Sequence, residues 1–144
     1  MATVNAYLTF DGNCETAFNF YKSAFGGEFC SVNRFGEMPQ QEGMPPLSEE
    51  MKNRVLHISL PVSAETVLMG SDTMPGMSPD ISVGNNFSIS LGVSSKEEAD
   101  SLFAALSADG KVTMPLDNTF WGAYFGMWTD KFGINWMVNY DLPK

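Results

Sequence analysis

The sequence is short of positive charge. Eight Lys and Arg residues stand against seventeen Asp and Glu residues, which gives a formal net charge of −9. A charge of this sign repels phosphate backbones and anionic lipid headgroups at long range. We therefore expect neither a nucleic acid nor a membrane surface as a partner.

Cysteine, long apolar runs and targeting signals are also scarce. Cys14 and Cys30 follow no CxxC or zinc-ligand spacing, so a disulfide framework has little support and we expect two reduced structural thiols. No run approaches the ~18 apolar residues of a membrane-spanning helix, and residues 1–10 lack the basic and apolar regions of a secretory signal. These features predict a cytoplasmic protein.

Missing motifs disfavour several chemistries. His57 is the only histidine, so a site that needs two or three imidazoles cannot be built within one chain. The sequence has no GxSxG nucleophile elbow, no GxGxxG dinucleotide fingerprint and no GxxxxGK[ST] phosphate loop. Serine hydrolysis and a Rossmann cofactor are therefore weak hypotheses, and nothing resembles a Gly-rich S-adenosylmethionine loop.

Apolar side chains, in contrast, are abundant. The chain of 144 residues is 44% hydrophobic and 12% aromatic, with eleven Phe and ten Met. A chain of this length usually forms one domain with a real core. The apolar content exceeds what the packing of two helices requires, so we expect part of it to line a cavity.

The first half of the chain reads as strand, helix and three strands. A helix is predicted over residues 14–25, with Asn13 as its N-cap, helical spacing of Ala17, Phe18 and Tyr21, and a Gly-Gly stop at 26–27. Alternating β-branched and aromatic runs bounded by turn residues predict strands at 6–10, 28–35, 54–60 and 65–71.

The same order returns after the turn-rich segment 73–86. Ser95 and Glu98 form a capping box for a helix that Gly110 ends. Strands are predicted at 87–93, 111–114, 122–128 and 134–140. The sequence therefore predicts an α+β fold of two tandem βαβββ modules, at about 1–74 and 85–144, within a single domain 1–144.

Three of the predicted strands have one apolar and one mixed face. Leu8 and Phe10 oppose Tyr7 and Thr9 in the first strand, because successive side chains point to opposite sides. The same alternation sets Leu56, Ile58 and Leu60 against Val55, His57 and Ser59, and Phe87, Ile89 and Leu91 against Ser88 and Ser90. Mixed faces on sheets whose other side carries a helix are typical of a ligand cavity, although a solvated face or a dimer interface would show the same pattern.

Two motifs resemble a known family. The chain opens with YLTFDGNCETAFNFYKSAFGGE and later carries TFWG followed by FGxxTDKFGxxW. These residues look like the PhnB-like family, often labelled 3-demethylubiquinone methyltransferase-like, in the glyoxalase/bleomycin resistance/dioxygenase (vicinal oxygen chelate) superfamily. The resemblance covers nearly the whole chain and implies two βαβββ modules with curved mixed sheets around a cavity, and a homodimer.

The resemblance also indicates where metal-dependent relatives hold their metal. Aligning the strands places Tyr7, Met69, Ser88 and Met137 at those positions. A phenol, a hydroxyl and two thioethers are a poor set for a hard divalent cation. No cofactor is therefore expected, and His57 and Asp72, with Asn139, are only weak substitutes.

The sequence leaves three functions open, and whether the protein is an enzyme stays undecided. The first is binding of a small, largely apolar or aromatic molecule in a cavity lined by Tyr7, Thr9, His57, Ser88, Ser90, Trp121, Phe125 and Met137. The second is a metal-dependent lyase, isomerase or dioxygenase, with His57 and Asp72 completed by a partner subunit. The third is resistance by sequestration of a drug, for which an acidic protein suits a cationic compound.

Overall fold

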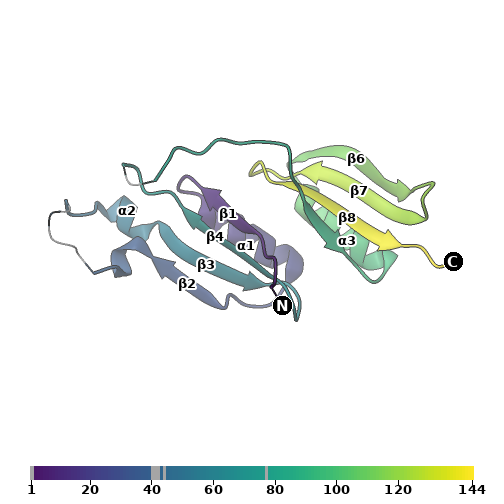
Figure 1. Cartoon of the computed structure of the whole chain (residues 1–144), viewed down its shortest axis with the longest axis horizontal. Coiled ribbons are helices and arrows are strands. Elements are labelled where there is room, and N and C mark those ends of the chain that lie inside the picture. The colour runs from purple at the N-terminus through teal and green to yellow at the C-terminus, as the bar shows by residue number, and fades with distance from the viewer. Residues whose placement is uncertain (1, 40–42, 44, 77) are drawn as a thin grey trace. The chain divides into compact units, whose positions relative to one another are not determined.

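The computed structural model describes residues 2–39, 43, 45–76 and 78–144. It divides into two compact units, the N-terminal unit Met1–Ser82 and the C-terminal unit Val83–Lys144. Figure 1 shows that each unit carries its own sheet and its own long helix.

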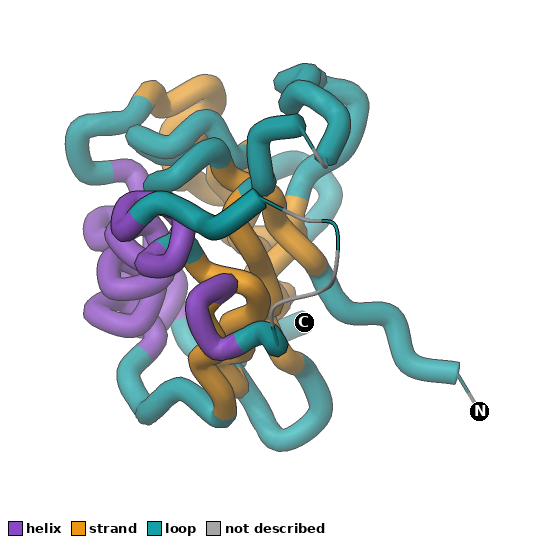
Figure 2. Tube along the Cα trace, turned by 90° about the vertical axis from the view of Figure 1, so that its left-hand side faces the viewer, coloured by secondary structure: helices purple, strands orange, loops and turns teal. Residues whose placement is uncertain are grey.

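The N-terminal unit has the order strand, helix and three strands. Its elements are β1 (Tyr7–Phe10), α1 (Cys14–Phe25), β2 (Ser31–Arg34), the 3-10 helix η1 (Phe35–Glu37), α2 (Glu49–Asn53), β3 (Val55–Pro61) and β4 (Val67–Asp72). The strands form one sheet in the order β1-β4-β3-β2, with β1 and β4 parallel and the other pairs antiparallel. Figure 2 shows helical coils to one side of the strands.

The C-terminal unit repeats this topology. Its elements are β5 (Ile89–Gly92), α3 (Lys96–Ser107), β6 (Lys111–Asn118), β7 (Ala123–Thr129) and β8 (Asn135–Asp141). The sheet order is β5-β8-β7-β6, again with one parallel pair, β5 and β8. The predicted α+β architecture of two βαβββ modules is confirmed.

Several predicted boundaries were wrong. The strand predicted at 28–35 begins only at Ser31, and the strand predicted at 87–93 shrinks to Ile89–Gly92, which leaves Phe87 outside it and 65% exposed. The strand predicted at 111–114 continues to Asn118 through Pro115. A proline is tolerated there because β6 is an edge strand, where its missing N–H costs no ladder hydrogen bond.

Each long helix covers one face of its own sheet. A Cβ atom built on Gly70 would lie 2.6 Å from the ring of Phe18 in α1, and one built on Gly126 would lie 2.8 Å from the ring of Phe103 in α3. These glycines therefore mark close approach of helix and sheet. We call the opposite sides the N-terminal open face and the C-terminal open face.

The turn between β7 and β8 is organised by a buried aspartate. Asp130 Oδ1 accepts hydrogen bonds from the N–H groups of Phe132 and Ile134, at 2.8 and 3.1 Å, and Oδ2 accepts one from Trp136 Nε1 at 2.8 Å. Gly133 takes a φ of 89°, as its place in the turn predicts. The TDKFG segment of the C-terminal motif is thus a structural turn that anchors the core residue Trp136.

The starts of both long helices refine their predictions. Asn13 is the N-cap residue of α1, as predicted, and its carbonyl oxygen accepts from Ala17 N–H at 3.0 Å, but its side chain makes no capping hydrogen bond. Ser95 Oγ does accept from the N–H of Glu98, as predicted, but the carboxylate of Glu98 accepts from Ser94 N–H at 3.0 Å.

Candidate functional site

Strand register places eight side chains in two rows on the N-terminal open face. Tyr7 pairs with Met69, and Thr9 pairs with Ser71. The alternate residues of β1, Leu8 and Phe10, point to the helix side and are buried. Extending both rows across the sheet gives Tyr7, Met69, Ser59 and Ser31 in one, and Thr9, Ser71, His57 and Asn33 in the other.

Tyr7 and His57 meet diagonally across this face. The Tyr7 hydroxyl lies 3.4 Å from His57 Nδ1, and the two rings stack with centroids 5.8 Å apart and an interplanar angle of 28°. Tyr7 remains 49% exposed. The structure therefore brings together two predicted site residues that lie fifty positions apart in the sequence.

The remaining members of the rows are almost all neutral hydrogen-bonding groups. Ser31 and Ser59 share a hydrogen bond of 3.0 Å between their hydroxyl oxygens. Of the eight side chains only Met69 lacks a strong hydrogen-bonding group, and none carries a permanent charge. The N-terminal open face therefore offers hydrogen bonds without fixed charge.

The C-terminal open face has two corresponding rows of different chemistry. One contains Ser90, Met137, Met127 and Met114, and the other contains Gly92, Asn139, Phe125 and Asp117. The rows place three thioethers and an aromatic ring on one face of the sheet, where Met127, Met137 and Phe125 are half-buried. Such a surface offers polarizable, adaptable contacts to an apolar ligand.

An aromatic cluster adjoins Phe125. The ring of Trp121 lies 5.8 Å from that of Phe125 in an edge-on arrangement, and Trp121 is 53% exposed. Phe120 stacks edge-on against Trp121 at 5.1 Å and is 98% exposed. Trp128 and Trp136, in contrast, are buried in the core, so only part of the aromatic motif is free to contact a ligand.

The predicted site residues therefore fall into two groups. Tyr7, Thr9 and His57 share the N-terminal open face. Ser90, Phe125 and Met137 share the C-terminal open face, with Trp121 against Phe125. Ser88 lies before β5, and Ser90 takes the place beside Met137.

Sequence reasoning missed several side chains of the same rows. They alternate with buried residues along their strands, and this period of two is the signal that could have found them once the strand ends were known. The missed residues are Ser31, Asn33 and Ser71 in the N-terminal unit, and Met114, Asp117 and Met127 in the C-terminal unit. Ser59 was assigned to the mixed face but not to the cavity.

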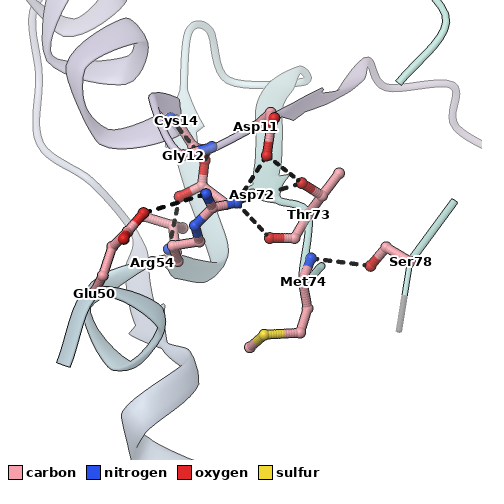
Figure 3. Close-up of polar contacts among 10 residues, drawn as sticks. Asp11, Gly12, Cys14, Glu50, Arg54, Asp72, Thr73, Met74 and Ser78 are labelled. Atoms are coloured by element: carbon pink, nitrogen blue, oxygen red, sulfur yellow. Dashed lines mark hydrogen bonds and ion pairs between the residues drawn. The ribbon is translucent and has the colours of Figure 1, made fainter. Parts of the chain in front are cut away.

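Asp72 has a structural role on the helix side of the N-terminal sheet (Figure 3). Its Oδ1 accepts hydrogen bonds from the N–H groups of Gly12 and Cys14, and Oδ2 accepts one from Val55, each at 2.9 Å. Asp72 is only 4% exposed. Its carboxylate thus caps the start of α1 in place of the Asn13 side chain and ties that helix to β3.

Asp11 and Arg54 lie next to this cap. Arg54 Nη1 donates to Asp11 Oδ1 at 2.9 Å and to the carbonyl oxygen of Thr73 at 3.1 Å. The hydrogen bond from Arg54 holds the pKa of the Asp11 carboxyl below its usual value. Figure 3 shows the guanidinium between Asp11 and Glu50, with both of which it forms ion pairs.

The residues do not fit a divalent metal site. Asp72 points to the helix side, whereas His57 lies on the opposite, open face, so the two cannot share an ion. Of the positions implied by metal-dependent relatives, Tyr7 lies beside Met69, which sets a phenol beside a thioether. Met137 pairs with Ser90 and not with the predicted Ser88, and a hydroxyl beside a thioether is again a poor pair for a hard cation. Within the described ranges, no three His, Cys, Asp or Glu side chains form a group able to hold a metal.

The two cysteines differ in their exposure to solvent. Cys14 is buried and Cys30 is exposed; both are free thiols. Burial raises the pKa of the Cys14 thiol well above its ordinary value.

None of the helices in the described part of the chain is long and apolar enough to cross a membrane.

Comparison with known sequences identifies close relatives. The family described as 3-demethylubiquinone-9 3-methyltransferase matches residues 2–139. Protein YjdN of Escherichia coli (strain K12) is 33% identical over 141 residues, which cover 94% of this chain and 93% of YjdN.

Solved structures support the same relationship. Protein PA1353 from Pseudomonas aeruginosa is 39% identical with a TM-score of 0.83, over 99% of this chain and 100% of that one. A putative 3-demethylubiquinone-9 3-methyltransferase, PhnB protein, from Bacillus cereus is 26% identical with a TM-score of 0.74, over 96% and 99% of the two chains. A glyoxylase/bleomycin resistance protein/dioxygenase domain from Frankia sp. EAN1pec shares the fold, with a TM-score of 0.67 at 11% identity over 98% and 92%. The chain thus has the glyoxalase/bleomycin resistance fold and belongs to the PhnB-like family described as 3-demethylubiquinone-9 3-methyltransferase.

Proposed function

We propose that the protein binds a small, largely apolar or aromatic molecule on the C-terminal open face. The observation that carries this proposal is the cluster of Trp121, Phe125, Met127 and Met137, which presents aromatic rings and thioethers on the side of the sheet opposite α3. A fully structural role would bury Trp121 as it buries Trp128, yet Trp121 is half exposed.

The chemistry of this face favours a flat apolar ligand. An aromatic ring gains about 0.5–1.5 kcal/mol from a favourable ring–ring geometry, in addition to the apolar area that it removes from water. Thioethers add contacts at ring edges. Polar groups at the margins, Ser90 and Asn139, can orient a ligand by hydrogen bonds without binding it through charge.

Titration with the neutral fluorescent probe N-phenyl-1-naphthylamine tests the proposal. We expect saturable binding, and about tenfold weaker binding in Trp121→Ala and Phe125→Ala, since about 1.4 kcal/mol of lost contact corresponds to a factor of ten. Trp121 is half exposed, so its removal should change the melting temperature little.

The matched control is Phe87→Ala, which removes another largely exposed ring of the same unit from outside the two rows. Its affinity for the probe should equal that of the unmodified protein. Equal binding in Trp121→Ala and Phe125→Ala, or a loss as large in Phe87→Ala, would remove the basis for this site.

A further inference from the structure

The N-terminal open face combines a stacked Tyr–His pair with a surrounding surface that carries no fixed charge. His57 is flanked in its own row by Ser71 on β4 and Asn33 on β2. Along β3, its neighbour on this face is Ser59. Among the described residues, Tyr7 on β1 is the titratable side chain found against the imidazole.

The two nitrogen atoms of His57 are not equivalent. Nδ1 lies against the Tyr7 hydroxyl, whereas Nε2 has no hydrogen-bond partner among the described residues. A neighbour on one nitrogen restricts the ring orientation of a histidine, and in the tautomer that carries its proton on Nδ1 the other nitrogen, Nε2, accepts a proton. The ring stacking between Tyr7 and His57 restricts the imidazole further.

We propose that His57 is a proton-accepting site for the acidic hydroxyl of a planar organic molecule, a phenol or an enol, and that Tyr7 is its positioning residue. On binding, the O–H bond of the ligand breaks and an Nε2–H bond forms. The products are an imidazolium and an aryloxide or enolate, so protons and charge balance without another reactant. Nδ1–H then donates to the Tyr7 oxygen.

The charge of the protein determines how such a ligand approaches. A net charge of −9 opposes the approach of an anion, so the ligand arrives neutral and ionises on the face. Once formed, the anion meets imidazolium and hydroxyl donors, and no carboxylate in either row. Transfer requires a ligand whose hydroxyl is acidic enough to protonate an imidazole.

This proton-accepting site lies on a different face from the site of the proposed function.

Titration with 4-nitrophenol tests the proton transfer. This probe absorbs visible light strongly only as the phenolate, and it is used at a pH where the free probe is mostly protonated. We expect the protein to raise the phenolate absorbance saturably. Because His57 is the only histidine, its C2–H proton resonance should shift simultaneously to the imidazolium position.

Three variants assign the effect. His57→Gln should abolish the phenolate signal. Tyr7→Phe should retain it with at least threefold weaker binding and a displaced pH midpoint of the His57 resonance, which a purely structural role would not move. Glu28→Gln, at an exposed side chain of the N-terminal unit outside both rows, and Phe87→Ala, outside the rows of the C-terminal unit, should match the unmodified protein.

The outcomes separate this inference from the proposed function. Phenolate formation that survives His57→Gln, binding of the probe only in its protonated form, or no binding would each overturn it. Loss of N-phenyl-1-naphthylamine binding would leave it standing, since that probe has no acidic hydroxyl.

Discussion

Replacing Asp72 with alanine removes the acceptor that joins three segments of the N-terminal unit. The carboxylate receives N–H groups from the loop before α1, from the first residue of α1 and from the first residue of β3. The donors of Cys14 and Val55 are buried, whereas that of Gly12 is only partly buried and can turn to water.

The expected loss follows from these two buried donors. A buried donor left without a partner costs about 1–3 kcal/mol. Two such donors give a loss of roughly 2–5 kcal/mol in the free energy of unfolding, allowing for partial relaxation. At about 1.4 kcal/mol per factor of ten, the open fraction of the unit should rise about 30- to 4,000-fold.

Thiol labelling measures this opening directly. Cys14 is buried and Cys30 exposed, so in a Cys30→Ser background a disulfide reagent reacts only when the N-terminal unit opens. All three tryptophans lie after residue 82, so their fluorescence follows the C-terminal unit in the same sample.

The control is Asp11→Asn, which alters an exposed carboxylate in the same cluster and should accelerate labelling far less. If Asp72→Ala labels Cys14 within threefold of the parent rate, the capping role is refuted.

Two further predictions concern packing and ionisation. Gly70→Ala should lower the free energy of unfolding in urea by about 1–3 kcal/mol, because the new Cβ would lie 2.6 Å from the Phe18 ring and 2.8 Å from the Leu8 carbonyl oxygen. The control Gly92→Ala, with no atom within 4 Å of its Cβ, should be nearly neutral. Equal losses of stability in the two variants would contradict the packing argument. The hydrogen bond to Asp100 raises the pKa of Tyr124 from 10.0 to about 12. Since this pKa is raised on folding, its contribution to stability is intact below about pH 10 and lost as the pH rises toward 12. Ultraviolet titration should show one tyrosine ionising late, and Asp100→Asn should move it toward its ordinary range; an unchanged curve would argue against the hydrogen bond.

Local sequence patterns were sufficient for the order of elements. The helical spacing after Asn13 and the Ser95–Glu98 signal located both long helices, because these patterns act over one or two turns. Strand ends were less accurate. Hydrogen bonding to the neighbouring strand determines where a strand ends. For example, β6 continues through Pro115 because it lies at a sheet edge.

The candidate sites show the same division. Alternation along β1 was enough to separate Tyr7 and Thr9 from the buried Leu8 and Phe10. In β3 the alternation predicted Val55 on the same face as His57, but the register shift between β2 and β3 lies between these two residues, and Val55 is buried. Only strand pairing could show that Tyr7 reaches His57 diagonally across β4, fifty residues away. Register depends on long-range hydrogen bonds that no short window contains.

The sequence by itself determined the two βαβββ modules, the acidic charge and the family, because periodicity, composition and motif are properties of neighbouring residues. Tertiary structure alone decided that Asp72, fifty-eight residues from Cys14, caps α1. It also decided that Asp72 and His57 lie on opposite faces of one sheet, since a side chain acquires its partners only when distant strands pair.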